Sequence, residues 1–534
     1  MVQNLTAQQL DRRSLLRGAV AAGLAVAEVP FLHTRPALAQ FKDNPFTLGV
    51  AAGEPAPDGF VIWTRLAPRP LLGRGGMAPV PIEVKWELAN DPAMQQVVRD
   101  GKTTAWPELA HSVHVELGAL EPARDYFYRF RAGGAESPVG RARTLPAPGA
   151  TVAQFRFASA GCQGWEGGFF TAWRSIAEEA FDLVVHYGDY IYENRHVTVD
   201  RQGRPFPRTL PSDFPLCLNL IDYRRRYALY KSDPDLQAAH ASCAFLASFD
   251  DHEVVDNWAA DSDRRNTPPE AFLFRRAAAF QAWYEHMPVR NSMLPHGPNL
   301  LAYRLLRIGN LADLAVLDTR QYRSRQPCGD GFHSQCVEAD EPNRTMLGGQ
   351  QERWLAEGLR AQQGTWQVLA QQVLFSRFDW RSFPWLKAPD VEIRRMDTWD
   401  GASAGRDRVL KILQDVQARN PVVLTGDLHM GMAIEIKDDW NEPNSRCAGV
   451  EFLATSISSS GDGSPTVSNA DALHRHNPHL KFIDNERGYT RHVVTPKTWR
   501  ADYRVVEKVS VPGAATSTRK SFVVEAGRPG LADA

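Results

Sequence analysis

The sequence predicts an α/β or mixed α+β layer architecture that follows a smaller all-β domain. Three observations support this prediction. Residues 43–145 alternate apolar and polar positions over short runs that Gly- and Pro-rich turns separate. From residue 150 to residue 528, short apolar runs alternate with amphipathic stretches, as in layered folds of helices and strands. The chain has 534 residues, enough to bury a sizeable core in more than one domain.

The first 39 residues have the layout of a twin-arginine (Tat) export signal. Arg12 and Arg13 precede two leucines, an uncharged stretch covers residues 18–27, and Ala-Leu-Ala at 37–39 forms a small-x-small cleavage site. The apolar stretch is too short, and too rich in Ala and Gly, to span a membrane. We therefore expect recognition by the Tat export machinery, a periplasmic or secreted mature chain, and no transmembrane segment. An amphipathic N-terminus without a targeting role is the alternative.

The run IEVKWEL at residues 82–88 illustrates the all-β pattern of the N-terminal region. Its apolar side chains occupy every second position, which predicts a strand with one buried face. Residues 113–117 and 126–130 repeat the pattern. We expect a small antiparallel sandwich of the fibronectin or immunoglobulin kind over residues 43–145. The sequence LPAPG at 145–149 closes it, and no cluster of catalytic residue types lies within it.

Charge and cysteine usage narrow the function classes. The 61 basic and 62 acidic residues nearly cancel, and without a polybasic run there is little support for a nucleic-acid-binding patch. Cys328 and Cys336 bracket a short polar loop, and we expect a disulfide between them in an oxidising compartment. The other four cysteines are scattered along the chain: Cys162, Cys217, Cys243 and Cys447.

Potential metal ligands follow the ends of five predicted strands. They are Cys162 after FASAG, Asp189 after LVVHYG, Asp250-Asp251-His252 after FLASF, Asp318 with Arg320 after LAVL, and Asp427 with His429 after VVLTG. Ligands bind at the carboxyl ends of strands in open α/β sheets, so we expect these residues to converge. Taken singly, each has a structural alternative: a Gly-Asp turn or helix N-cap, a solvated acidic loop, or an inert packed cysteine.

The order of these motifs resembles the PhoD-type alkaline phosphatases and phosphodiesterases of the metallophosphoesterase superfamily. Residues 188–192, GDYIY, match the GDxxY motif of purple acid phosphatases, in which the Asp bridges two metals and the Tyr binds ferric iron. Residues 250–253, DDHE, and 426–429, GDLH, match the PhoD forms of two later motifs. Cys162 stands where that family also uses Cys. The resemblance covers nearly the whole mature chain and implies a mixed α+β fold with a metallophosphoesterase-type β-sandwich flanked by helices. Asp256 departs from it, since Asn is expected there.

The donor types predict two different cations. The first set is Cys162, Asp189, Tyr192 and His429. Thiolate and phenolate together favour a trivalent cation, and iron(III) fits them. The second set is Asp189, Asp251 and Asp427. It offers only oxygens, which suit calcium, magnesium or manganese. We expect Fe³⁺ beside Ca²⁺, in agreement with what the resemblance implies.

Two metals close together predict phosphate-ester hydrolysis, in which a hydroxide held on the iron attacks phosphorus in line. The resemblance implies that His252 hydrogen-bonds the phosphate or the leaving-group oxygen, as a transition-state stabiliser or general acid. Arg320 is a candidate for holding the phosphate in bidentate fashion. A salt bridge between Arg320 and Asp318 or a neighbouring acid is the alternative.

These expectations combine into one function and two rivals. The chain is expected to be an exported, metal-dependent hydrolase of phosphate mono- or diesters, acting on small-molecule or polymeric substrates. A phospholipase D-like phosphodiesterase acting on lipid or teichoic-acid diesters is the nearest rival. A secreted binding protein without catalysis is the second, and the complete set of donor residues argues against it.

Overall fold

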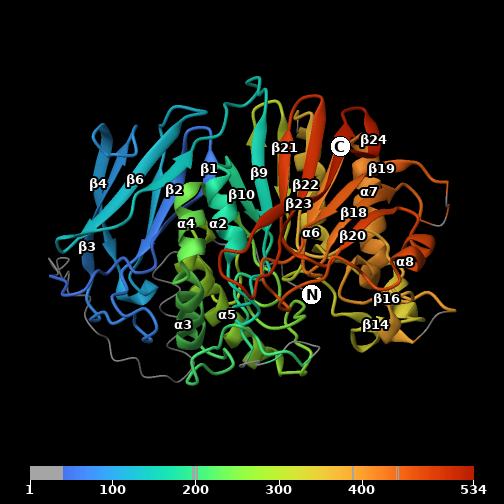
Figure 1. Ribbon diagram of the computed structural model, residues 1–534, viewed down its shortest axis with the longest axis horizontal. Coiled ribbons are helices and arrows are strands. Elements are labelled where there is room, and N and C mark those ends of the chain that lie inside the picture. Colours follow the sequence, from blue (N-terminus) through green and yellow to red (C-terminus); the bar gives the residue numbers. More distant parts are fainter. Residues whose placement is uncertain are drawn as a thin grey trace, which may run out of the picture.

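The computed structural model describes residues 40–534, except 195–198, 200–202, 362, 388–389, 441 and 443. The expected export signal, residues 1–39, lies outside the described residues. Two large sheets, of ten and seven strands, form the body of the molecule (Figure 1). A five-stranded sheet lies at the N-terminal end, and a two-stranded sheet lies near the candidate ligands.

The ten-stranded sheet has the order β24-β23-β22-β21-β9-β10-β11-β1-β2-β5. Its strands are β24 (Arg528–Asp533), β23 (Thr516–Glu525), β22 (Thr498–Val506), β21 (Arg487–Val494), β9 (Phe155–Ala160), β10 (Leu183–His186), β11 (Ala244–Ala247), β1 (Val50–Ala56), β2 (Gly59–Arg65) and β5 (Ser112–Leu117). The four central strands β9, β10, β11 and β1 are parallel. Three of them, β9 to β11, are the apolar runs that precede candidate ligands.

The seven-stranded sheet has the order β12-β13-β15-β17-β19-β18-β20. Its strands are β12 (Arg304–Ile308), β13 (Ala312–Val316), β15 (Trp366–Ala370), β17 (Pro421–Thr425), β19 (Cys447–Leu453), β18 (Gly431–Lys437) and β20 (Leu480–Asp484). Strands β13, β15, β17 and β19 are parallel, so their carboxyl ends share one edge. The loops after β13 and β17 carry the remaining candidates.

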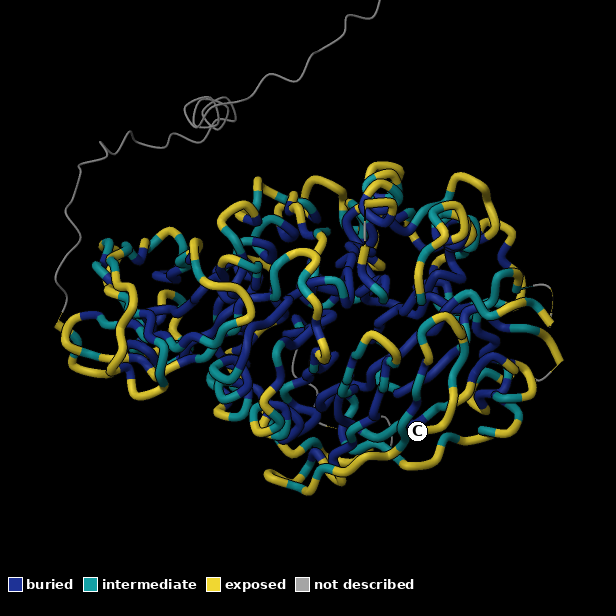
Figure 2. The backbone as a smooth tube through the Cα atoms, turned by 90° about the horizontal axis from the view of Figure 1, so that it is seen from above, coloured by how far each residue is buried: buried dark blue, intermediate teal, exposed yellow. Residues whose placement is uncertain are grey.

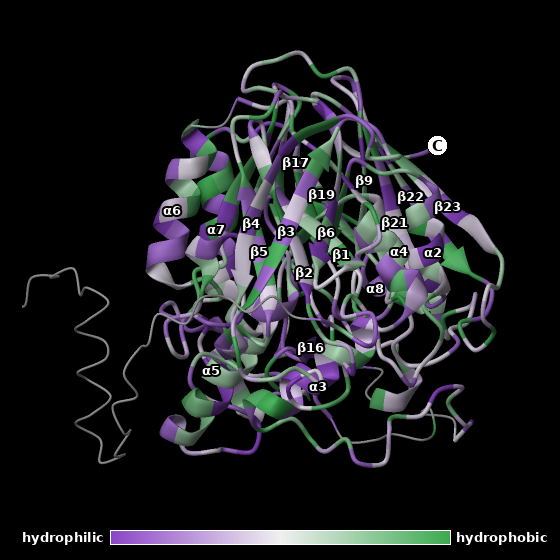
Figure 3. Ribbon diagram, turned by 90° about the vertical axis from the view of Figure 1, so that its left-hand side faces the viewer, coloured by the Kyte–Doolittle hydropathy of each residue, from purple (hydrophilic) through white to green (hydrophobic). Residues whose placement is uncertain are grey.

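The two sheets pack face to face and share one apolar core, to which Phe157 and Val185 contribute from one sheet and Leu314 and Val368 from the other. Helices cover the outer faces, so Figure 3 shows α6 and α7 on one side of the strands and α2 and α4 on the other. The helices are α2 (Thr171–Glu178), α3 (Leu220–Lys231), α4 (Pro234–Ser242), α5 (Pro269–His286), α6 (Gly348–Ala361), α7 (Ser403–Asp415) and α8 (Ala470–His476). Figure 2 shows buried backbone through the middle and exposed loops around it. This is the predicted sandwich flanked by helices.

The N-terminal region is all-β but is not a self-contained sandwich. Its five-stranded sheet contains β4 (Val97–Ala105), β3 (Ile82–Ala89), β6 (Asp125–Ala132), β7 (Ala135–Glu136) and β8 (Gly140–Arg143). Its other strands, β1, β2 and β5, continue the large sheet, because β1 pairs in parallel with β11. A Cβ on Gly53 of β1 would lie 2.2 Å from the carbonyl oxygen of Pro288, so glycine permits this close approach. The expected N-terminal sandwich is therefore joined to the large sheet by continuous hydrogen bonding.

The predicted disulfide between Cys328 and Cys336 is present, with the two Cα atoms 6.1 Å apart. It closes the loop that carries β14 (Phe332–His333), which pairs antiparallel with β16 (Arg394–Arg395). The remaining cysteines are free. Within the described residues, every helix is too short or too polar to cross a lipid bilayer.

Candidate metal centre

The loops after β9, β10, β11 and β17 bring eight of the candidate side chains to one place, Tyr192 among them. Three groups of potential ligands have donor atoms within 4.8 Å of one another in the described part of the chain. They are Cys162, Asp189 and His429; Asp189, Asp251 and His252; and Asp250, Asp251 and Asp427. Asp189 belongs to two groups, which is the position expected of a bridging ligand. Asp318 lies outside them and instead accepts hydrogen bonds from the backbone of Arg320 and Gln321.

Glycines allow these strand ends to lie close together. Gly161 and Gly426 each precede a candidate ligand and pack against the ring of Tyr187. An added Cβ would lie 2.5 Å from that ring at Gly161 and 2.1 Å at Gly426. At Gly188 it would lie 2.5 Å from the Cβ of Asp250. A side chain at any of these positions would push the loops apart, so the Gly preceding each ligand is required by packing.

Four candidate ligands have left-handed backbone conformations. The φ angles are 52° at Cys162, 54° at Asp189, 67° at Asp427 and 58° at His429. Such conformations cost free energy in a non-glycine residue, and they concentrate at functional sites where the surrounding structure enforces them. The strain falls on the residues that the sequence predicts to bind metal.

The first half of the site is the sulfur–phenol pocket, formed by Cys162, Asp189, Tyr192 and His429. The Tyr192 hydroxyl donates to Asp189 Oδ2 at 2.8 Å and lies 2.9 Å from His429 Nε2. Ser459 Oγ lies 2.7 Å from the same hydroxyl. Burial, with the nearby Asp189 carboxylate, raises the pKa values of the Cys162 thiol and the Tyr192 phenol well above their usual range. Both groups are therefore protonated unless a cation replaces their protons.

The second half is the carboxylate pocket, formed by Asp250, Asp251 and Asp427. Each of these buried carboxylates has one oxygen without a hydrogen-bond partner. Burial raises the pKa of Asp427 to about 6, although the adjacent Arg395 opposes the rise. Unsatisfied buried carboxylate oxygens are costly, and a hard cation would satisfy them. The donor sets of the two pockets thus fit a sulfur- and phenolate-binding cation beside an oxygen-binding one.

Arg320 lies beneath the carboxylate pocket, with no exposed side-chain surface. Its Nε donates to Asp250 Oδ1 at 2.6 Å, and its Nη1 donates to Asp397 Oδ1 at 2.9 Å. Nη2 is 3.6 Å from Asp251 Oδ1. The salt-bridge alternative therefore describes Arg320 better than a phosphate-holding role. The guanidinium balances the buried acids from behind.

His252 lies at the mouth of the site, with 14% of its side chain exposed and its ring 4.2 Å from that of Tyr192. Its Nδ1 is 2.7 Å from the Oε2 of Glu193, which is fully buried. Burial disfavours the imidazolium, but the Asp251 and Glu193 carboxylates outweigh it and raise the pKa of His252 well above its usual value. Because Nδ1 faces Glu193, Nε2 lies on the other side of the ring. In the protonated imidazole, Nε2 is free of Glu193 and can donate a hydrogen bond.

Several supporting residues have no role that the sequence predicts. Glu253 accepts hydrogen bonds from the backbone N–H groups of Asp189, Tyr190 and Asp250, and so fixes two ligand loops. Its place in the DDHE motif is a usable signal. Glu193 directly follows the GDYIY motif, and this position is a similar signal that it supports the site. Others, such as Asp397 and Arg395, follow no predicted strand and give no signal.

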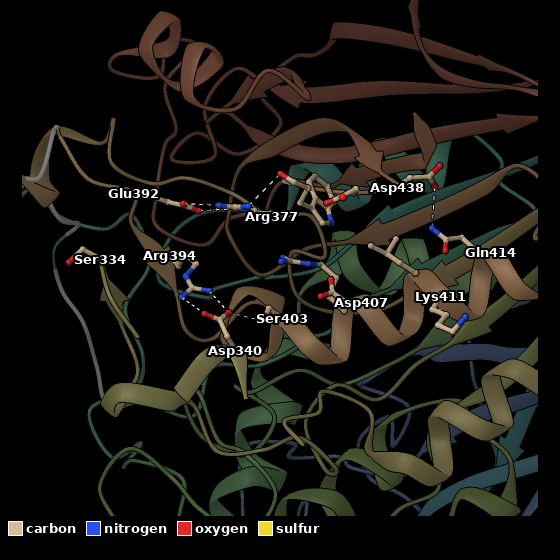
Figure 4. A pocket seen from close by; sticks show the side chains of 14 residues that line it. Ser334, Asp340, Arg377, Glu392, Arg394, Ser403, Asp407, Lys411, Gln414 and Asp438 are labelled. Carbon is tan, nitrogen blue, oxygen red and sulfur yellow. Dashed lines mark hydrogen bonds and ion pairs between the residues drawn. The ribbon is translucent and has the colours of Figure 1, made fainter. Parts of the chain in front are cut away.

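A separate, charged hollow of about 510 Å³ is lined by Arg394 of β16 among other residues (Figure 4). Arg394 lines it and pairs with Asp340, and Arg377 pairs with Glu392. None of the predicted ligands lines this hollow. These two arginines are paired with acids that also line the hollow, so it resembles a surface ion-pair network more than a site for chemistry.

Comparisons with known proteins agree with this geometry. A model of the PhoD-like phosphatase family matches residues 157–503, and a model of the N-terminal domain of PhoD-like phosphatases matches residues 33–146. Alkaline phosphatase D of Bacillus subtilis (strain 168) is 45% identical over 529 residues, covering 98% of this chain and 88% of the relative. A solved structure of PhoD is 46% identical over 93% of both chains, with a TM-score of 0.89.

A more distant similarity concerns the fold alone. Purple acid phosphatase PPD1 from yellow lupin seeds is 13% identical, with a TM-score of 0.52 over 91% of this chain and 75% of that one. The resemblance that the motifs indicated is confirmed by the family models and by the relative of high identity. The chain belongs to the PhoD-like phosphatase family.

Proposed function

We propose that this protein hydrolyses phosphate esters at a centre of iron(III) and calcium. The observation that carries the proposal is the convergence of Cys162, Tyr192 and His429 around Asp189, directly beside three carboxylates. Thiolate and phenolate donors favour iron(III), and carboxylate oxygens favour calcium. The relative named alkaline phosphatase D and the match to the PhoD-like phosphatase family support the reaction class.

Each group of residues has its own task in this proposal. When bound, the two cations would activate a water molecule and neutralise the charge of the phosphate. Cys162, Tyr192 and His429 would hold the iron, with Asp189 between the cations and Asp251 and Asp427 holding the calcium. His252 donates a hydrogen bond from Nε2 toward the ester, stabilising the leaving oxygen or giving it a proton. Arg320 opposes the rise that burial causes in the pKa values of Asp250 and Asp427.

Elemental analysis and visible spectroscopy of purified protein test the metals. Iron and calcium should each be present at about one or more per chain, and phenolate or thiolate bound to iron(III) should give a visible absorption band. A colourless protein that contains only zinc and is fully active would contradict the iron assignment.

Turnover of p-nitrophenyl phosphate and of bis(p-nitrophenyl) phosphate tests the reaction. Hydrolysis of either ester supports the proposed class. Strong preference for the diester would favour the alternative function, a phospholipase D-like phosphodiesterase. A metal-loaded protein that hydrolyses neither would favour the non-catalytic binding protein.

Export by the Tat route is part of the proposal and is supported by the twin arginines and by the Cys328–Cys336 disulfide, which suits an oxidising compartment. Replacing Arg12 and Arg13 by lysine should keep the precursor in the cytoplasm. Cell fractionation measures this, and normal export of the double variant would contradict it.

A further inference from the structure

Strand β16 presents two adjacent arginines to two different surroundings. Arg394 Nη1 donates to Asp340 Oδ1 at 2.7 Å, and its side chain lines the charged hollow of Figure 4. Arg395 Nη1 lies 3.3 Å from Asp427 Oδ2, in the carboxylate pocket. Successive side chains of a strand point to opposite faces, which explains the division. One arginine therefore belongs to the surface network and the other to the metal centre.

Arg395 has access to solvent that Arg320 lacks. In the described part of the chain, these are the two arginines within 4.0 Å of the pocket carboxylates. The Arg320 side chain is fully buried, whereas 21% of the Arg395 side chain is exposed. Arg320 is also engaged by Asp250 and Asp397 on separate nitrogens. Arg395 can meet a substrate by giving up its ion pair with Asp427, whereas Arg320 would have to leave several buried acids.

The backbone of Arg395 is held in place by the disulfide loop. Arg395 pairs with Phe332 in the β14–β16 ladder, and the N–H of the next residue, Met396, donates to the carbonyl of Gly331 at 2.8 Å. Cys328 and Cys336 close the loop that carries Phe332 and Gly331. A guanidinium on so fixed a backbone is a preorganised anion partner.

We propose that Arg395 binds the phosphate group of the substrate and makes the site prefer doubly charged phosphate monoesters to singly charged diesters. This inference rests on the proposed function. Asp427 Oδ2, the oxygen that faces Arg395, has no hydrogen-bond partner. When Asp427 turns to a cation, a phosphate oxygen can replace it as the anion beside the guanidinium. Arginine suits this exchange because its planar fork matches phosphate oxygens.

The selectivity follows from charge. A phosphate monoester carries nearly two negative charges above pH 7, because its second pKa is about 6, and a diester carries one. The second charge lies on the non-bridging oxygens. Loss of the guanidinium therefore removes more binding energy from the monoester than from the diester.

The test compares Arg395→Gln with the matched control Arg394→Gln from the same short strand. For Arg395→Gln, we expect kcat/KM on p-nitrophenyl phosphate to fall about 30-fold, and that on bis(p-nitrophenyl) phosphate to fall about 3-fold or less. Inhibition by inorganic phosphate should weaken about 10-fold in Ki. Arg395→Lys should recover part of each loss because it keeps the charge. Arg394→Gln should stay within about twofold of the native protein in all three measurements.

Metal content and thermal unfolding are measured on each variant. If Arg395→Gln loses calcium, its losses combine metal binding with phosphate binding. The Ki for phosphate and the ratio of kcat/KM on the two esters are then compared between the native protein and Arg395→Lys, which keeps a cation beside Asp427. Equal losses on the two esters, or unchanged inhibition by phosphate, would overturn the proposal. A native protein that hydrolyses neither ester would instead overturn the proposed function, so the two failures are distinguishable.

Discussion

The two halves of the site are held together by different interactions. In the sulfur–phenol pocket, Tyr192 hydrogen-bonds Asp189 and lies within hydrogen-bonding distance of His429, and burial keeps both the thiol and the phenol protonated. In the carboxylate pocket, arginines pair with acids that each have one oxygen without a hydrogen-bond partner. The first pocket must lose protons to take a cation, whereas the second holds Asp251, whose pKa is lowered against burial by the nearby His252 and Arg320, as a carboxylate. The pockets should therefore respond differently to the same disturbance.

The largest effect is expected from Cys162→Ser, which breaks the sulfur–phenol pocket. A serine hydroxyl ionises far less readily than a thiol and is a poor substitute for a soft thiolate donor. We expect loss of iron, loss of the visible band and a fall in kcat of about 1000-fold or more. The measurements are elemental analysis, absorbance and turnover of p-nitrophenyl phosphate.

Cys243→Ser is the matched control, because Cys243 is also buried and free but lies at the opposite end of β11 from the site. It should keep the iron and the colour. A Cys162→Ser variant with native colour and turnover would show that the thiol is not a ligand.

A calcium-selective chelator should separate the two pockets. It competes for an oxygen-bound cation, while the iron held by thiolate and phenolate is retained. We expect turnover to fall about 100-fold while the visible band persists, and added calcium to restore activity. Turnover that survives prolonged chelation would remove calcium from the proposal.

Glu193→Gln tests how the mouth of the site is organised. The Glu193 carboxylate lies within hydrogen-bonding distance of His252 Nδ1 and accepts a hydrogen bond from the backbone N–H of Asp256. It therefore fixes the direction of the imidazole. If His252 protonates the leaving oxygen, the variant should lose about 30-fold in kcat on phenyl phosphate and far less on dinitrophenyl phosphate, whose leaving group needs no proton. The measurement is the dependence of kcat on leaving-group pKa.

The control for this effect is Asp256→Asn. Asp256 is half-buried, and its carboxylate lies 4.0 Å from His252 Nε2, beyond hydrogen-bonding distance. The change should alter kcat by less than about threefold. If Glu193→Gln lost kcat equally on substrates with every leaving group, the role of His252 would be limited to binding the phosphate.

The sequence predicts those parts of the site that follow local rules. Apolar runs mark strands, and the residue that follows each run lies at the shared edge of a sheet, so Asp189 and Asp427 can be grouped from chain order alone. The disulfide is predictable because its two cysteines are only eight positions apart. These inferences need only the order of the motifs and the geometry of parallel strands.

Other features depend on contacts that local sequence does not record. Arg395 reaches the site from a strand of two residues, too short to give a periodic pattern. The pairing of β1 with β11 joins segments about 190 residues apart, so local patterns predict an independent N-terminal domain. Local sequence also does not decide whether Arg320 faces substrate or protein, since its burial depends on tertiary packing.

Lys231 is a buried basic residue outside the site, and its replacement has the smallest expected effect on activity. Arg320 is a buried cation among acids, whereas Lys231 is buried with its Nζ over the ring of Trp63, 4.1 Å from the centroid, and no ion pair joins it to an acid in the described residues. Burial lowers its pKa from 10.5 to about 7. The unfolded chain therefore binds one more proton between these pH values, and native stability rises with pH across that window.

Lys231→Met should raise stability by about 3 kcal/mol near pH 7, and the gain should shrink toward pH 10, with activity nearly unchanged. Thermal unfolding midpoints of both proteins at pH 7 and 9.5 check this, and a gain that grew with pH would mean that Lys231 is stabilised as a cation by partners that act like those of Arg320.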